Sequence, residues 1–214
     1  YFTSNTTKGA IGYASTAIGY DTYALGYNSI AMGTNTLSNG TYSTSMGRDT
    51  IASGKYSTAM GYNTTASGDY SVAMGRETFA SGLSSFAMGR TTTASGASSF
   101  AMGQSTTASG TISTAIGSWS TASASYAVAM GHATVASGTY STAMGSSTTA
   151  SANYSTAFGR KAYATGINST ATGYYSTASG DYSTAIGGKA YAGEDIAFAI
   201  GTLGVNAVNN STVQ

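Results

Sequence analysis

The residues that could carry out acid–base, nucleophilic or metal chemistry are few and scattered along the chain. The sequence holds one histidine, His132, seven Asp and Glu residues, and no cysteine. A nucleophile triad needs a histidine oriented by a third group, and a metal site needs several clustered ligands. His132 has no such neighbours in the sequence. The sequence therefore predicts no enzyme, no cofactor and no metal site.

The one adjacent pair of carboxylates is Glu194 and Asp195. A glycosidase needs two carboxylates that face each other across a cleft. Glu194 instead occupies a column that glycine fills in the repeat described below, and Gly193 comes one residue early. We interpret the pair as a slip of register, either a bulge or the end of the repeat domain.

Arginine and tyrosine form rows with chemistry suited to binding. The arginines follow a repeated glycine directly, and an acidic glycan or acidic protein could dock on them; the alternative is a solvated edge that blocks strand pairing. The tyrosines suit glycan or protein contacts; the alternative is that they cover a turn and stack on one another. The candidate ligand-binding residues are Arg48, Arg76, Arg90, Arg160, Tyr42, Tyr56, Tyr70, Tyr140 and Tyr154.

A third row is made of threonine, from Thr22 through Thr36 and Thr50 to Thr148, with Ser120 within it. Regular threonine ladders are typical of ice-binding solenoids. The residue two places further on is alanine, so a second threonine column is missing, and packing between repeats is the favoured interpretation.

These rows exist because the chain is an uninterrupted repeat. A glycine recurs every fourteen residues from Gly19 to Gly201, and an alanine and a large apolar residue usually precede it, as in Ala59-Met60-Gly61. A period held this strictly indicates a stack of similar turns. Each unit divides into two halves of seven residues, which are too short for a stable helix. A coiled coil is excluded because Gly, Ser and Thr would fill its core positions.

Short strands joined by tight turns fit this unit. Thr, Tyr, Val and Ile favour strands, and Gly with Asn, Asp or Ser favours turns. Two strands and two turns in fourteen residues close one turn of a flat solenoid, whose successive turns pair in parallel at about 4.8 Å. The sequence therefore predicts an all-β parallel β-roll with two short strands per turn.

Alternation within the strand predicts which side chains lie inside. We expect Ser57, Ala59 and Gly61 to point inward and Thr58 and Met60 outward. So narrow a solenoid would offer no concave pocket. A long exposed apolar stripe would promote aggregation of a monomer, so we predict a parallel homo-oligomer; the alternative is a wider monomer with methionine inside. The predicted interface residues are Met60, Met74, Phe86, Met88, Phe100, Met102, Met130 and Met144.

Composition supports a folded protein with few charged residues. Only 7% of the 214 residues are charged, the net charge is +1, and 41% are hydrophobic. Disordered chains combine low hydrophobicity with high charge, and nucleic-acid binding needs a basic surface; neither applies. No apolar stretch is long enough to span a membrane, so we expect any membrane attachment to lie in parts outside this chain.

The units Tyr70-Ser71-Val72-Ala73-Met74-Gly75, Ser113-Thr114-Ala115-Ile116-Gly117 and Ser183-Thr184-Ala185-Ile186-Gly187 resemble the Ser-Val-Ala-Ile-Gly repeat of YadA-type heads in trimeric autotransporter adhesins. The resemblance implies a homotrimer of left-handed parallel β-rolls on the outer membrane of bacteria, with a role in cell adhesion and virulence. Several such heads bind collagen or other extracellular-matrix proteins. The repeat also resembles modules of phage and viral fibres, which implies a virion location instead.

These observations divide the chain into a lead-in at residues 1–7, a β-roll head at residues 8–204, and a C-terminal tail or start of a neck at residues 205–214. We expect a non-catalytic adhesive head that attaches avidly to host or matrix protein or glycan. The alternative is a structural segment of a phage or viral fibre.

Overall fold

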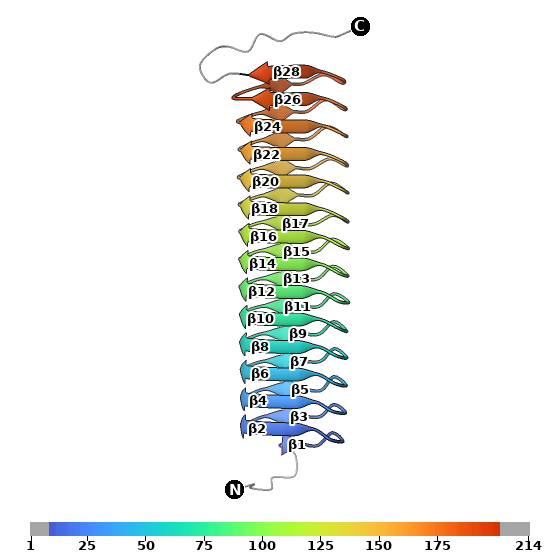
Figure 1. Cartoon of the computed structure of the whole chain (residues 1–214), viewed down its shortest axis with the longest axis vertical. Helices are drawn as coiled ribbons and strands as arrows, with labels where there is room; N and C mark the ends of the chain where they lie inside the picture. Colours follow the sequence, from blue (N-terminus) through green and yellow to red (C-terminus); the bar gives the residue numbers. More distant parts are fainter. Residues whose placement is uncertain (1–8, 202–214) are drawn as a thin grey trace. The chain divides into compact units, whose positions relative to one another are not determined.

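The computed structural model describes residues 9–201, and every regular element in that range is a β-strand. The predicted lead-in and C-terminal tail lie outside the described residues. The chain divides into two compact units, residues 1–105 and residues 106–214. In both units a long strand and a short strand alternate along the chain (Figure 1).

In the first unit the long strands form one parallel sheet and the short strands a second. The long strands are β2 (Thr16–Tyr20), β4 (Ile30–Thr34), β6 (Thr44–Arg48), β8 (Thr58–Tyr62), β10 (Val72–Arg76), β12 (Phe86–Arg90) and β14 (Phe100–Gln104). The short strands are β1 (Gly9–Ala10), β3 (Tyr23–Ala24), β5 (Leu37–Ser38), β7 (Ile51–Ala52), β9 (Thr65–Ala66), β11 (Phe79–Ala80) and β13 (Thr93–Ala94).

The second unit repeats this arrangement. Its long strands are β16 (Thr114–Ser118), β18 (Val128–His132), β20 (Thr142–Ser146), β22 (Thr156–Arg160), β24 (Thr170–Tyr174), β26 (Thr184–Gly187) and β28 (Phe198–Gly201). Its short strands are β15 (Thr107–Ala108), β17 (Thr121–Ala122), β19 (Val135–Ala136), β21 (Thr149–Ala150), β23 (Tyr163–Ala164), β25 (Thr177–Ala178) and β27 (Tyr191–Ala192).

Each residue pairs with its equivalent in the next turn of chain, which we call a rung. Strand β8 pairs with β10 so that Met60 faces Met74 and Gly61 faces Gly75. The short strands keep the same register, with Thr65 opposite Phe79. The predicted fold, an all-β parallel solenoid with two short strands in each fourteen-residue turn, is confirmed.

The interior is filled with the smallest side chains. Ser57, Ala59, Thr64 and Ala66 of one rung are all 0% exposed, and the same columns are buried in most other rungs. Met60 and Thr58 lie on the outer face and are half-buried. This confirms the predicted side-chain orientation in the long strand, with serine and alanine inside and methionine outside. The described residues exclude the alternative with methionine inside.

The glycine column differs from the prediction. Gly61 is exposed and not interior. Its φ is +129°, and a Cβ there would lie 1.9 Å from the carbonyl oxygen of Gly75. Glycine is required because the backbones of successive rungs approach closely at this bend, in a conformation that L side chains rarely adopt.

Two further residues in most rungs have positive φ without being glycine. Asn63 (φ 51°) ends the turn after the long strand, and Tyr70 (φ 59°) ends the turn after the short strand. Their backbone N–H groups donate to carbonyl oxygens of the preceding rung, Asn63 to Arg48 at 2.9 Å and Tyr70 to Lys55 at 2.7 Å. These bonds between rungs offset the cost of the left-handed conformation, which is of order 1–3 kcal/mol for a non-glycine residue.

The predicted slip of register at Glu194 is wrong. Strand β26 pairs with β28 in the regular register, with Thr184 opposite Phe198. The side chain of Asp195 accepts a hydrogen bond from the backbone N–H of Asp181 at 2.8 Å, just as Asp69 does from Lys55 at 2.9 Å. Glu194 therefore takes the place of a turn glycine within an intact rung, and its neighbour links that rung to the previous one.

The threonine row lies inside the solenoid. Its members from Thr36 to Thr148 are 0% exposed, and most of their hydroxyls have no hydrogen-bond partner among the described residues. A buried row cannot present hydroxyls to ice. The structure thus removes the ice-binding interpretation of this row and supports the packing one.

We expect Gly75→Ala to destabilise the fold by about 3 kcal/mol or more, because its Cβ would meet the Gly89 carbonyl oxygen at 2.0 Å and its φ is +122°. Gly193→Ala is the matched control, since there the atoms nearest to the Cβ belong to the Tyr191 side chain, which can rotate away, and not to backbone. Urea unfolding followed by circular dichroism would measure both. Equal stability of the two variants would contradict the close approach between rungs.

Thr50 and Thr64 occupy the same interior column but differ in their hydroxyl partners. Thr50 Oγ1 lies 2.6 Å from Ser45 Oγ, whereas Thr64 Oγ1 has no hydrogen-bond partner among residues 9–201. Thr50→Val should lower the free energy of unfolding by about 0.5–1.5 kcal/mol because it breaks a buried hydrogen bond. Thr64→Val should leave stability unchanged or raise it. Thermal unfolding of the two variants side by side tests this, and a larger loss for Thr64→Val would refute it.

Candidate binding surfaces

The outer face of the long-strand sheet carries two apolar columns. In the first unit Val72, Phe86 and Phe100 are register partners on successive rungs. Met74, Met88 and Met102 form the neighbouring column. The rings of Phe86 and Phe100 stack at a centroid distance of 5.0 Å, and these residues are half-buried.

All the residues predicted for the subunit interface lie on the outer face of the long-strand sheet in their own unit. Met60 continues the methionine column of the first unit, and in the second unit Met130 pairs with Met144 in the same column. Their half-burial leaves apolar area exposed on a flat sheet. That they contact sister chains stays a prediction.

The tyrosines stand at the turn after the short strand, in left-handed conformation, and stack from rung to rung. In the first unit Tyr42 stacks on Tyr56 and Tyr56 on Tyr70, each with centroids 5.0 Å apart. In the second unit Tyr140 stacks on Tyr126 at 4.6 Å and on Tyr154 at 5.2 Å. Stacking occupies the ring faces within each run, so the outward contacts left to these tyrosines are ring edges and hydroxyls. Their role in ligand binding stays a prediction.

The arginines extend from the end of the long strand and are exposed. Arg48 Nε lies 3.3 Å from Asp49 Oδ2, and Arg76 Nε lies 3.1 Å from Glu77 Oε1. Neighbouring carboxylates therefore partly neutralise two of the arginines. The Tyr62 ring lies between the Arg48 and Arg76 guanidiniums, 5.4 Å and 5.9 Å from them, within cation–π range.

Arg90 and Arg160 differ from those two. Arg90 is the register partner of Arg76, and its side chain has no ion pair within residues 9–201. Arg160 lies over the Tyr174 ring at 5.5 Å. Four exposed cations on this column can attract an anionic group, but the structure places only Arg76 and Arg90 on adjacent rungs. Their role in binding a ligand also stays a prediction.

One polar pair was not found from the sequence. Lys161 Nζ donates a hydrogen bond to Tyr175 Oη at 2.5 Å, across one rung. This bond raises the pKa of the Lys161 ammonium and lowers the pKa of the Tyr175 phenol. Both side chains stand in the column two residues after the repeated glycine, fourteen residues apart, so the in-register stacking of rungs brings them together. Because both groups are exposed, the pair is a surface feature.

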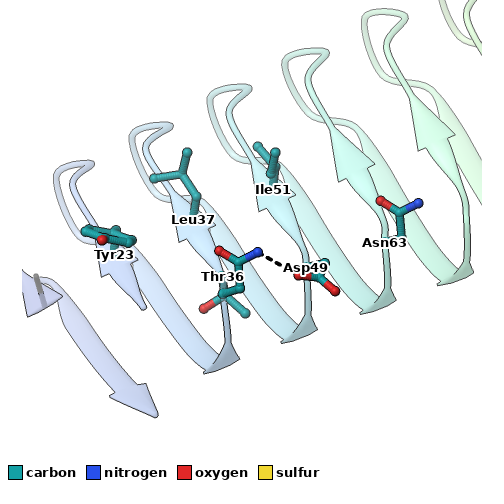
Figure 2. A pocket seen from close by; sticks show the side chains of 7 residues that line it. Tyr23, Thr36, Leu37, Asp49, Ile51 and Asn63 are labelled. Atoms are coloured by element: carbon teal, nitrogen blue, oxygen red, sulfur yellow. Dashed lines mark hydrogen bonds between the residues drawn. The ribbon is translucent and has the colours of Figure 1, made fainter. Parts of the chain in front are cut away.

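The first unit also has an open groove, contrary to the expectation that so thin a solenoid has no concavity. Its volume is about 350 Å³. Figure 2 shows its walls, with Tyr23, Leu37 and Ile51 from short strands and Asp49 and Asn63 from turns. Asn35 Nδ2 donates to Asp49 Oδ1 at 2.6 Å, across one rung.

The groove was missed because its two walls are different columns of the repeat. Two residues after the glycine, the first rungs carry only amides or carboxylates, at Asp21, Asn35, Asp49, Asn63 and Glu77. Four residues after the glycine, they carry Tyr23, Leu37 and Ile51 where many later rungs have threonine. Aligning the repeats by column would have shown both departures.

No element within residues 9–201 suggests a reaction centre or a membrane span. His132 is exposed at the end of β18. Among the described residues there is no cluster of three or more His, Cys, Asp or Glu residues placed to hold a metal ion. Nor does that part of the chain contain a helix long and apolar enough to cross a bilayer.

A family model described as the YadA head domain repeat, in two copies, matches the chain repeatedly. The matched residues are 10–36, 24–50, 38–64, 52–78, 80–106, 108–134, 136–162 and 164–190. A search of curated proteins finds no match. The matches cover most of the chain and follow the fourteen-residue register of the rungs. By its repeat and by its parallel solenoid fold, the chain belongs to the YadA head repeat family, whose members are extracellular adhesin heads and not known enzymes.

Proposed function

We propose that the chain forms a non-catalytic, homotrimeric adhesive head that attaches to a matrix protein or a glycan at a bacterial cell surface. Family membership supports an adhesin-like head, and the apolar outer face supports the trimer. The interior contributes little hydrophobic stabilisation, because alanine, serine and threonine have little apolar area.

The outer face of the long strands is the part of the surface that best fits a subunit interface. Its two columns place methionines and aromatic or β-branched residues in register on successive rungs. Complete burial of a large apolar side chain contributes roughly 1.5–3 kcal/mol. A half-buried side chain would gain part of that free energy when a subunit covers it. Repetition over many rungs adds these increments along the whole contact.

Adhesion by such a head depends on repetition. Each rung presents similar turn residues, and three copies multiply them, so weak contacts combine through effective concentration. The tyrosine hydroxyls and the exposed arginines are the proposed contact groups. The observation that carries the proposal is the repeated match to the adhesin family over most of the chain.

Replacing Met88 and Met102 with Asp should dissociate the trimer, because the carboxylates would be buried at the chain contact. Each protomer should keep its β-rich circular dichroism, since both side chains lie outside the solenoid. The matched control is Thr107→Asp with Thr121→Asp, two outward residues of adjacent short strands. Sedimentation velocity would measure the assembly. A trimer unchanged by the methionine substitutions would refute this interface.

The purified trimer should bind collagen, fibronectin, laminin or at least one member of a glycan array saturably. The monomeric Met88→Asp/Met102→Asp variant should bind the same immobilised ligand at least about a hundredfold more weakly, because avidity is lost. Surface plasmon resonance on dense and sparse ligand surfaces would separate avidity from a change in the site. If none of these ligands binds saturably, the result would contradict adhesion and favour a structural fibre segment.

A further inference from the structure

The groove of the first unit is a concave feature that the arginine and tyrosine rows do not explain. It crosses successive rungs, because Tyr23 pairs with Leu37 and Leu37 with Ile51 in register. Its volume of about 350 Å³ falls at the small end of the range for ligand sites. Figure 2 shows the apolar side chains along one wall and the amide and carboxylate side chains along the other.

The backbone N–H groups of the residues on both walls are already engaged between rungs. The N–H groups of Asn35, Asp49 and Asn63 donate to carbonyl oxygens of the preceding rung at 2.9–3.0 Å. The N–H groups of Tyr23, Leu37 and Ile51 donate to the following rung at 2.8–2.9 Å. An extended peptide that binds by adding a strand needs free main-chain partners, so this groove does not suit one.

The polar wall instead offers side chains that both donate and accept. Asn35 uses one N–H for Asp49 and keeps its carbonyl oxygen and a second N–H. The Asn63 amide has no hydrogen bond to the described residues and is exposed. Hydroxyl groups also donate and accept, so a row of ligand hydroxyls is complementary to a row of amides.

The apolar wall suits the hydrophobic face of a sugar ring. Tyr23 is held in place because its hydroxyl donates to Asp21 Oδ1 at 2.8 Å, and Leu37 and Ile51 extend the wall along the next rungs. Aromatic and aliphatic side chains that are fixed before binding lose little entropy when a ligand packs on them.

The charge of the groove is nearly balanced. Asp49 is the carboxylate among the lining residues, and its Oδ2 lies 3.3 Å from Arg48 Nε. A near-neutral site gives no advantage to a sulfated or carboxylated glycan, which would meet Asp49, nor to a strongly basic peptide, which would compete with Arg48.

From these observations we propose that the groove between the Tyr23–Leu37–Ile51 wall and the Asn35–Asp49–Asn63 wall binds a neutral, extended oligosaccharide. The ring faces of the sugars pack on the short-strand residues, and their hydroxyls exchange hydrogen bonds with the amides. This deepens the proposed adhesive function by assigning it one site and one ligand class. A trimer carries three such grooves, which adds avidity to a shallow site.

The test uses the intact protein on a microarray that contains neutral, sulfated and sialylated oligosaccharides, followed by calorimetry with the strongest neutral ligand. The variant Asn35→Gly/Asn63→Gly removes both amides but keeps the left-handed turns, since glycine tolerates their φ values of 53° and 51°. We expect at least about tenfold weaker binding. Asn168→Gly (φ 55°) is the matched control outside the groove and should bind as the wild type does.

A second pair of variants tests the apolar wall. Leu37→Thr and Ile51→Thr introduce threonine, which this column already carries at Thr65, the register partner of Ile51. The fold should therefore persist. We expect each to weaken binding severalfold, whereas Tyr163→Thr, in the same column of the second unit, should not. Circular dichroism and sedimentation would establish that every variant folds and assembles.

Two results would overturn the proposed groove site alone. One is binding of matrix proteins or anionic glycans without any neutral glycan, which would leave the adhesive function standing. The other is neutral-glycan binding that the groove variants leave unchanged, which would place the glycan site elsewhere. Absence of all binding would overturn the adhesive function together with this site.

Discussion

In-register stacking of identical turns is the constraint on which the rest of the structure depends. Parallel strands pair at a spacing of about 4.8 Å, and here each residue lies opposite its equivalent on the next rung. Every column must therefore tolerate its own repetition at that distance. The bend after each long strand brings backbone so close to backbone that a Cβ at Gly61 would lie 1.9 Å from the next carbonyl oxygen. This explains why one glycine column has no exception.

The same constraint makes the interior small and moves the apolar area outside. A two-strand turn of fourteen residues encloses room for alanine, serine and threonine, which are fully buried. Methionine and phenylalanine are left on the outer face of the long strands, half-buried in register. A solenoid of this kind differs from an ordinary domain because its largest apolar side chains are available to other subunits and do not fill its own core.

Self-stacking also sorts the surface columns. Repetition stabilises the tyrosine column, because parallel rings stack with centroids 4.6–5.2 Å apart along the turns. Repetition destabilises an arginine column, because like charges on neighbouring rungs repel each other. Asp49 and Glu77 beside two guanidiniums and the Tyr62 ring between them reduce that repulsion. Asparagine and aspartate alternate favourably, because the amide of one donates to the carboxylate of the next. The groove of the first unit follows from that alternation beside larger short-strand residues.

Periodicity alone determined the parallel solenoid, its two strands per turn, and the separation of Ser57 and Ala59 from Met60, because strand pairing and side-chain alternation follow fixed spacings. The family followed from the repeated Ser-x-Ala-Met-Gly units. The tertiary structure decided what depends on the turns: the exposure of Gly61, the left-handed Tyr70, the intact register at Glu194, the burial of Thr64, and the groove beside Asn35. Backbone bends set these features, and a one-dimensional pattern does not specify which way a bend turns its neighbouring columns.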